Sequence, residues 1–364
     1  MSGIDPGAHR DPVLARRLID AIGRLADDRA ITLMEVCGTH TMNIGRYGFR
    51  SVMPPGVRLL SGPGCPVCVT PNHDLDNAIA LARVDGVTLA TFGDLMRVPG
   101  SSTTLARCKA DGCDVRVVYS PLDALALARS LPHRQVAFAA VGFETTAPAV
   151  AATILRARER GLENFSVLCS HKTTPPALRA IARDPDTRID GFILPGHVAA
   201  ITGIDPFGFL PREFHTPGVV TGFEPVDILE GIATLIRMVA AEAPAIENTY
   251  RRVVAPRGNP VARQLVDQVF EPVDAVWRGL GTVSASGLRI RSTYAGLDAQ
   301  QRFDLEAEPA RTAPGCRCGD VLRGAIPPGS CPLFGRSCTP EHPIGPCMVS
   351  SEGSCAAAHR FREP

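Results

Sequence analysis

The stretch QVAFAAV at 135–141, followed by APAVAATILRARERG at 147–161, is the clearest indication of the fold. A run that is apolar at nearly every position is typical of a strand buried on both faces, and the segment after it has helical spacing. The same alternation recurs from about residue 30 to residue 230. The other apolar runs are ITLMEV (31–36), VRLLS (57–61), VTLATF (87–92), VRVVYS (115–120), FSVLCS (165–170), DGFILP (190–195) and GVVTG (218–222). This rhythm predicts an α/β fold with parallel sheets.

The number of strand-like runs predicts more than one domain. Eight runs are many for one open sheet, and 364 residues exceed what one core usually fills. We expect two doubly wound parallel-sheet domains, 1–130 and 131–245, with a seam at the turn Leu131–Pro132. The periodic stretch DILEGIATLIRMVAAEAP (227–244) predicts one long helix that ends by Pro244. The remaining residues, 246–364, are expected to form a smaller, mixed domain with a cysteine-rich tail.

Composition limits the classes of partner. The net charge is +1, from 38 basic and 37 acidic residues without long runs of either sign, so we expect neither a nucleic-acid partner nor an anionic membrane. No stretch reaches the roughly 18 to 20 apolar residues of a membrane span, and the first 25 residues lack the apolar core of a signal peptide. We therefore expect a cytoplasmic protein. In that reducing compartment, 12 cysteines indicate metal ligation or redox chemistry.

Half of the cysteines lie in the tail. They are Cys316, Cys318, Cys331, Cys338, Cys347 and Cys355. Apolar residues are too sparse there for a separate core, so the segment needs a metal or covalent staple. Six thiols exceed the four that a 4Fe-4S cluster or a structural zinc requires, and a surplus pair beside a cluster suggests a dithiol that exchanges electrons with it. A structural zinc with two idle thiols is the alternative that spacing leaves open.

Two further cysteine motifs follow strand-like runs. Cys65 and Cys68 form a C-x-x-C in a turn before a predicted helix, which favours a redox pair, although two packing cysteines remain an alternative. Cys37 ends a strand-like run and is followed by Thr39 and His40. A thiol with a hydroxyl and an imidazole beside it is typical of a ligand or nucleophile, whereas a lone cysteine at a strand end is often buried filler.

Other polar groups also follow apolar runs, at the edge where open α/β sheets bind ligands. They are Glu144 with Thr145, His171, and His197. Helix capping by threonine and ordinary buried histidines explain part of this pattern without function. No glycine-rich dinucleotide fingerprint and no GxxxxGK[ST] loop is present, so the sequence does not support nucleotide use.

Taken together, the motifs resemble the HypD family of NiFe-hydrogenase maturation factors, and the resemblance covers nearly the whole chain. The motifs are MEVCGTHT (34–41), GPGCPVC (62–68), TFGDLMRVPGS (91–101), GFETTAP (142–148), SHKTTPPA (170–177), GFILPGHV (191–198), and CRCGDVLRG through CPLFGRSCTPEHPIGPCMVSSEGSC (316–355). The resemblance implies two α/β domains and a small domain with a 4Fe-4S cluster. It also implies a redox-active assembly scaffold rather than a conventional turnover enzyme.

The resemblance further implies partners and a cargo. Family members form a complex with the small chaperone HypC, on which the Fe(CN)2CO group is assembled. The cyanide comes from HypE, which works with HypF, and the finished group passes to the hydrogenase large subunit. All of these are expectations from family likeness.

Residue roles follow from the same likeness. Cys37 would hold the iron together with a cysteine of the chaperone, and Cys65 and Cys68 would be a redox pair near that iron. Thr39, His40, Glu144, Thr145, His171 and His197 would line the cleft as donors to cyanide or as proton relays. Cys316, Cys331, Cys338 and Cys355 would bind the cluster, and Cys318 and Cys347 would be the spare disulfide-forming pair.

The sequence is also compatible with two other functions. A thiol-disulfide oxidoreductase of the ferredoxin-thioredoxin reductase type would use the cluster and the Cys65/Cys68 pair to reduce a protein disulfide, without iron at Cys37. A zinc-stapled binding module would hold tetrahedral zinc and have no redox activity.

Overall fold

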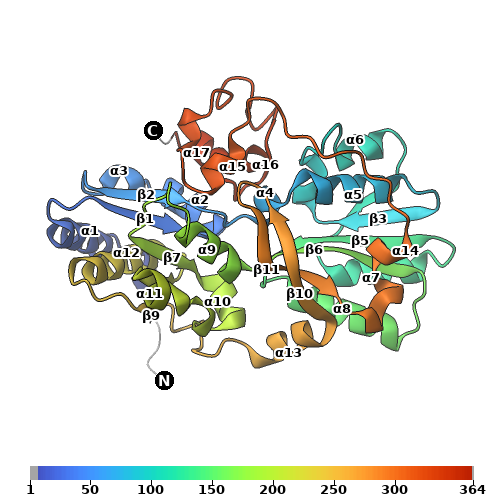
Figure 1. Ribbon diagram of the computed structural model, residues 1–364, viewed down its shortest axis with the longest axis horizontal. Helices are drawn as coiled ribbons and strands as arrows, with labels where there is room; N and C mark the ends of the chain where they lie inside the picture. The colour runs from blue at the N-terminus through green and yellow to red at the C-terminus, as the bar shows by residue number, and fades with distance from the viewer. Residues whose placement is uncertain (1–6, 363–364) are drawn as a thin grey trace.

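The structure is a computed structural model that describes residues 7–362, and it contains two parallel sheets with a smaller cysteine-rich region between them (Figure 1). The first sheet has the order β2-β1-β7-β8-β9, with the strands β1 Ile31–Glu35, β2 Val57–Ser61, β7 Gly191–Pro195, β8 Gly218–Thr221 and β9 Ile246–Asn248. The second has the order β4-β3-β5-β6, with β3 Val87–Thr91, β4 Val115–Val117, β5 Gln135–Gly142 and β6 Phe165–His171. The α/β class with two parallel sheets is confirmed.

Helices cover both faces of each sheet, which explains why the strands are apolar at successive positions. On the first sheet, Leu33 of β1 packs in one core and its neighbour Met34 in another. The helices around these two cores are α1 Pro12–Ala26, α2 Gly38–Arg46, α3 Phe49–Val52, α9 Thr174–Ala182, α10 Gly196–Thr202, α11 Phe209–Phe214 and α12 Pro225–Ala240. The expected long helix is therefore α12, which begins two residues earlier than its periodic stretch and ends at Ala240.

The second sheet is built in the same way. Leu89 of β3 faces the core under α5, and Ala90 faces the core under α7 and α8. The helices around this sheet are α5 Asn72–Arg83, α6 Leu105–Ala110, α7 Pro121–Ser130 and α8 Ala147–Glu159. Short 3-10 helices complete the α/β part, at Ala8–Arg10, Gly93–Arg97 and Asp205–Phe207.

The chain crosses between the sheets twice. It leaves the first sheet after β2 through α4 (Pro66–Val69), and it returns after β6 through α9. The expected boundary at residue 131 therefore does not separate the sheets: β3 lies before it and β5 after it, yet these two strands pair in parallel from Val87↔Gln135 to Thr91↔Ala139. Local periodicity locates strands but carries no information on which strands pair.

The C-terminal part also differs from the expected division at residue 246, because β9 completes the first sheet. A β-hairpin, β10 Phe270–Trp277 and β11 Gly281–Ile290, then packs against β6 and α9. The tail follows, and it lies above the junction of the two sheets (Figure 1). Its helices and those around the hairpin are α13 Pro260–Val269, η4 Ser292–Leu297, α14 Ala299–Arg302, α15 Cys318–Leu322, η5 Pro328–Ser330, α16 Pro346–Val349 and α17 Ser354–Phe361. The outermost residues of the expected domains, 1–6 and 363–364, lie outside the described part.

Contacts of the tail helices bring its cysteines to the α/β part. α17 packs against α2, and α15 and α16 pack against α4. The tail thus covers the helices that follow β1 and β2. Within residues 7–362, none of the helices has the length and apolar character needed to cross a bilayer.

Candidate functional site

Cys37 lies directly after β1, at the N-cap of α2, and is nearly buried with 9% of its surface exposed. Glu35, two residues earlier, is also buried, and its carboxylate accepts hydrogen bonds from the backbone N–H of Cys37 (3.2 Å) and the hydroxyl of Thr41 (2.5 Å). Burial raises the pKa of the Cys37 thiol to about 12, and the nearby Glu352 carboxylate adds to the shift. Burial also raises the pKa of Glu35 to about 7. The thiol is therefore protonated at neutral pH.

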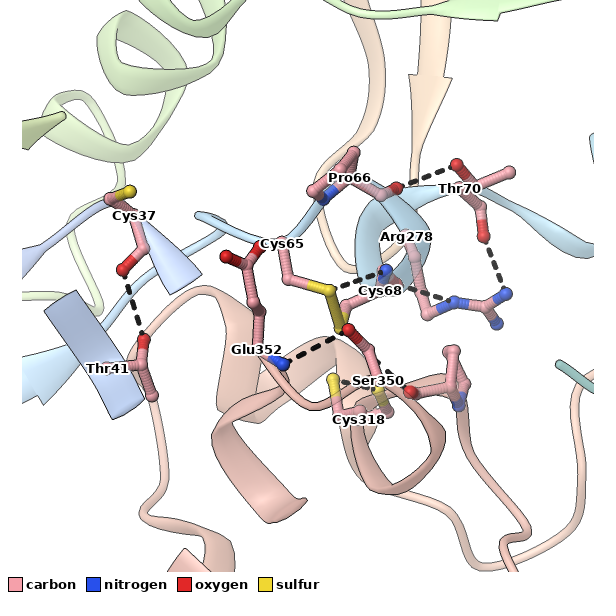
Figure 2. The surroundings of a disulfide bond; sticks show 12 residues. Cys37, Thr41, Cys65, Pro66, Cys68, Thr70, Arg278, Cys318, Ser350 and Glu352 are labelled. Carbon is pink, nitrogen blue, oxygen red and sulfur yellow. Dashed lines mark hydrogen bonds between the residues drawn. A yellow bond between two sulfur atoms is a disulfide. The ribbon is translucent and has the colours of Figure 1, made fainter. Parts of the chain in front are cut away.

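Glu352 comes from the tail and lies over the Cys37 loop. Its carboxylate accepts a hydrogen bond from the hydroxyl of Thr39 at 2.8 Å. A Cβ placed on Gly38 would lie only 2.4 Å from the Cβ of Glu352, so this approach requires glycine. In Figure 2 the Glu352 side chain lies between Cys37 and the Cys65–Cys68 disulfide. The tail therefore contributes a side chain directly to the Cys37 site.

Cys65 and Cys68 form a disulfide in a turn that is bonded to the Cys37 loop. The backbone N–H of Gly38 donates to the carbonyl of Gly64 at 3.0 Å, and a Cβ on Gly64 would be 2.3 Å from the backbone nitrogen of Cys37. On the other side, Arg278 of the hairpin donates to the carbonyls of Cys68 (3.1 Å) and Thr70 (2.7 Å) (Figure 2). The pair is fixed between the first sheet and the hairpin.

The six tail cysteines line one small cavity, together with apolar groups from Leu333, Phe334 and Met348. Within it, the sulfurs of Cys318 and Cys347 lie 2.7 Å apart. The sulfur of Cys338 accepts a hydrogen bond from the backbone N–H of Ile344 at 3.3 Å. Among the described residues, no three His, Cys, Asp or Glu side chains are arranged to hold a single metal ion. The tail thiols instead surround a shared space.

The two sulfur groups meet at Pro346. The sulfur of Cys68, which is fully buried, lies 3.9 Å from the carbonyl oxygen of Pro346. Pro346 immediately precedes Cys347, which lines the six-cysteine cavity. The sulfur groups are therefore spatial neighbours, from the tail through Cys68 and Cys65 to the loop that carries Cys37.

Two histidines stack on opposite sides of one phenylalanine at the same end of the first sheet. The ring of Phe223 lies 4.5 Å from that of His40 and 4.0 Å from that of His197. His40 is fully buried, and its Nε2 lies 2.9 Å from the carbonyl oxygen of Gly222. Burial lowers the pKa of His40 to about 4, and it lowers the pKa of His197 as well. His40 is therefore neutral, and the Gly222 carbonyl requires that Nε2 carries the proton.

The other ring nitrogen of His40 is unusual. Nδ1 is buried without a hydrogen-bond partner among residues 7–362. With the proton on Nε2, Nδ1 has a free lone pair, so it can accept a hydrogen bond or a proton and cannot donate one. A buried polar atom without a partner is costly, and such atoms are concentrated at functional sites.

Glu144 and His171 lie at the end of the second sheet. The Glu144 carboxylate accepts hydrogen bonds from the backbone N–H (2.7 Å) and hydroxyl (2.9 Å) of Thr174. His171 Nε2 lies 3.0 Å from the hydroxyl of Thr146, and Thr145 is exposed. Burial raises the pKa of Glu144 to about 7 and lowers the pKa of His171 to about 4. Among residues 7–362, these groups form no hydrogen bond with Cys37, so they are a separate cluster.

Sequence reasoning missed three residues of the site: Glu35, Glu352 and Arg278. An acidic residue inside the apolar run ITLMEV was a detectable signal for Glu35, since buried strands rarely carry carboxylates. Glu352 lies in the SSEGSC segment between two tail cysteines, and Arg278 follows Trp277. Nothing local in either stretch indicates that the side chain reaches a loop more than 200 residues away.

Comparisons with known proteins agree with this arrangement of motifs. A family model described as "HypD: Hydrogenase formation hypA family" matches residues 13–362. Proteins named Hydrogenase maturation factor HypD are similar over their full length. The one from Rhodobacter capsulatus is 47% identical over 363 residues (97% of this chain and 96% of the relative), and the one from Escherichia coli K12 is 42% identical over 362 residues (98% and 97%).

A third relative of the same name, from Rhizobium leguminosarum bv. viciae, is 47% identical and covers 98% of this chain and 95% of its own length. Matches of this extent include the Cys37 loop, the Cys65–Cys68 turn and the cysteine tail alike. The resemblance inferred from the motifs is confirmed, and the chain belongs to the HypD family of hydrogenase maturation factors.

Proposed function

We propose that this hydrogenase maturation factor is an iron-sulfur scaffold that works with a HypC-type chaperone to assemble the Fe(CN)2CO group. The observation that supports the proposal is the spatial succession of sulfur groups from the six-cysteine cavity to Cys37. Pro346, which precedes Cys347, has its carbonyl oxygen 3.9 Å from the Cys68 sulfur, and Gly64 of the disulfide turn is hydrogen-bonded to the Cys37 loop. Such an arrangement suits a site that binds iron at one thiol and exchanges electrons through the others.

Cys37 is the proposed ligand of the iron cargo. Low-spin iron with cyanide and carbonyl ligands is soft, and thiolate is a soft donor. The pKa of the free thiol is raised to about 12 by burial, so binding of the cation must displace a proton. The lone pair of His40 Nδ1 is a candidate acceptor for a proton at this end of the sheet. This favours a proton-relay role for His40 over a donor to cyanide.

The tail residues fit a 4Fe-4S cluster. Thiols are the ligands such clusters require, the cavity wall is partly apolar, and a backbone N–H already points at the sulfur of Cys338. The close approach of Cys318 and Cys347 supports their assignment as the spare pair. Cys316, Cys331, Cys338 and Cys355 remain as the proposed ligands. When bound, the cluster would supply one-electron redox chemistry.

The remaining partners follow the family pattern. HypE, with HypF, is the proposed source of cyanide, and the hydrogenase large subunit is the proposed recipient of the finished group. We place this work in the cytoplasm, where the thiols outside the two disulfide-forming pairs stay reduced.

A thiol-disulfide oxidoreductase is the second candidate, favoured by the Cys65–Cys68 disulfide beside the tail. Exchange with a protein substrate requires that one sulfur of the pair be accessible to an attacking thiol. Cys65 is 3% exposed and Cys68 is fully buried. Internal electron transfer needs no such access, so the geometry favours the scaffold.

The test is metal and sulfide analysis of anaerobically purified protein, followed by infrared spectra after co-purification with the chaperone. We expect about four irons and four sulfides per chain, with cyanide and carbonyl bands that disappear in Cys37→Ala and persist in the matched control Cys108→Ala. Cys108 is also buried but lies in α6, beside the second sheet. Zinc without sulfide would instead indicate a binding module, and a cluster without the bands would indicate a plain reductase.

A further inference from the structure

A second pocket lies beside the six-cysteine cavity and shares a wall with it. Cys316, Cys318 and Gly345 line both spaces. The charged side chains of this second pocket are Arg278, Arg311, Arg317, Arg323 and Asp320. We call it the arginine pocket. Its lining contains no residue of the Cys37 loop, so the proposed cargo site does not account for it.

The charges in the arginine pocket are only partly neutralised. Asp320 accepts hydrogen bonds from both Arg317 and Arg323, and Arg323 also pairs with Asp184 at 3.3 Å. Asp186 lies 3.9 Å from Arg323 as well. The charge of Arg323 is therefore compensated by acids from outside the pocket.

Two of the other arginines, Arg278 and Arg311, form no ion pair among residues 7–362, whereas Arg317 pairs with Asp320. Arg278 is held by neutral oxygens, the carbonyls of Cys68 and Thr70. The Arg311 guanidinium is exposed and has no hydrogen-bond or ion-pair partner among residues 7–362. Arg317 is half exposed at the rim. Against Asp320 these three arginines leave two positive charges in excess, whereas the net charge of the whole chain is +1.

We propose that the arginine pocket is the docking site for an acidic protein that carries one electron at a time and reduces the tail through the shared wall of Cys316 and Cys318. This inference rests on the proposed function, because it requires a cluster in the neighbouring cavity. In each encounter, one electron leaves the carrier, which is oxidised, and enters the cluster, which is reduced. No bond is made or broken and no proton moves.

A protein carrier fits these observations better than a small anion. Arg311 and Arg317 are exposed at the rim and therefore face an approaching surface, whereas a small-anion site would need buried donors that converge on one point. Complementary charge at a rim mainly raises the rate of association, and it does so in a salt-dependent way.

The experiment uses a plant-type ferredoxin as the acidic probe. Its binding to the full chain is measured by titration at low and high salt, and reduction of the cluster is followed in a stopped-flow instrument. Photoreduced deazaflavin, a small donor that needs no docking site, serves as the second reductant. The variants are Arg311→Glu, Arg311→Lys, and the matched control Arg16→Glu, which changes the same charge on an exposed position of α1.

We expect Arg311→Glu to weaken ferredoxin binding and to slow reduction by ferredoxin roughly fivefold to tenfold at low salt. Arg311→Lys and Arg16→Glu should behave as the wild type, and deazaflavin should reduce every variant equally. Unchanged ferredoxin binding in Arg311→Glu would overturn the docking site, as would a wild type that deazaflavin reduces but ferredoxin does not bind. A chain without a reducible cluster would overturn the proposed function instead, and the binding titration would still decide the docking site.

Discussion

The carboxyl ends of the two sheets carry matching buried groups. Each has one glutamate whose pKa is raised to about 7 and one histidine whose pKa is lowered to about 4: Glu35 and His40 on the first sheet, Glu144 and His171 on the second. Each end also has a cysteine, Cys37 after β1 and Cys169 in β6. Burial in a parallel sheet is therefore enough to produce perturbed pKa values, and these alone do not identify the functional end.

The ends differ in what covers them. At the second sheet, local hydrogen bonds satisfy the polar groups: Thr174 donates to Glu144, Thr146 contacts His171, and the Cys169 thiol lies 3.2 Å from the carbonyl oxygen of Leu288. At the first sheet, Glu352 from the tail reaches the Cys37 loop. The Nδ1 atom of His40 has no hydrogen-bond partner among residues 7–362. The tail, rather than the sheet, therefore distinguishes the two ends.

Replacing the cysteine at each end should give the largest difference between the two sheets. We expect Cys37→Ala to abolish hydrogenase maturation, because it removes the proposed iron ligand while the neighbouring Cys65 is held in a disulfide. Cys169→Ala should leave maturation unchanged. Both replacements remove one sulfur from a mostly buried site, so both should lower the free energy of unfolding by about 1 kcal/mol.

The measurement is hydrogenase activity in cells that depend on the variant, with urea unfolding of the purified proteins as the stability control. Loss of maturation in Cys169→Ala at normal protein levels would show that the second sheet takes part. Normal maturation by Cys37→Ala would remove this thiol from the mechanism.

Removing the tail staple should have the next largest effect. We expect Cys338→Ala to bleach the cluster and to destabilise the tail by several kcal/mol, since a small metal-bound region loses the free energy of binding. The two sheets should remain folded, because only the core under α5 contains tail residues, whereas the other three cores contain none. Limited proteolysis checks both points: cleavage should begin after about residue 305 and leave the α/β part intact. A brown variant with a resistant tail would contradict the ligand assignment.

The sequence predicted the elements of this fold better than their assembly. The apolar runs located the strands because burial on both faces leaves a direct mark on composition. The apolar runs on either side of Leu131 gave no information on which strands pair. β3 and β5 would both be apolar whether or not a domain boundary lay between them. Cys37 and His40 were predicted as neighbours from a spacing of three residues. Glu352 and Arg278 were not, because their contacts with the site depend on how the tail and hairpin pack.

Two of the carboxylates that accept hydrogen bonds from threonines, Glu352 and Glu144, offer a sharper comparison. We expect Glu352→Gln to lower the pKa of Cys37, since the negative charge near the thiol is removed while the hydrogen bond to Thr39 can persist. A shift of about one pKa unit would accelerate thiolate-dependent alkylation of Cys37 roughly tenfold at a given pH. Glu144→Gln is the matched control and should leave that rate unchanged.

Alkylation is followed by mass spectrometry of the Cys37 peptide across a pH series, in protein freed of iron. An unchanged pH profile in Glu352→Gln would show that the carboxylate does not act on the thiol. A general rise in alkylation at Cys108 as well would indicate loosening of the fold instead.

The dependence of stability on pH gives the smallest expected effect. The folded state disfavours protonated His171, whose pKa falls from 6.5 to about 4, so its contribution is full above pH 6.5 and is lost as the pH falls toward 4. Glu144 has the opposite sign. Its pKa rises from 4.5 to about 7, so its contribution is full below pH 4.5 and is lost as the pH rises toward 7. The two terms partly cancel between pH 4.5 and 6.5.

The variant His171→Gln should remove the histidine contribution, so that the pH dependence of stability due to Glu144 can be measured. When the pH is lowered from 7.5 to 5, the free energy of unfolding of the variant should change more favourably than that of the wild type by about 2 kcal/mol, which follows from 1.36 kcal/mol per pKa unit over the part of the His171 shift that lies above pH 5. Urea unfolding at the two pH values measures this difference. Maturation should be normal in this variant, because His171 contacts Thr146 rather than the Cys37 loop. A variant that matures no hydrogenase yet unfolds as predicted would mean that the end of the second sheet acts in the reaction without any contact to the first.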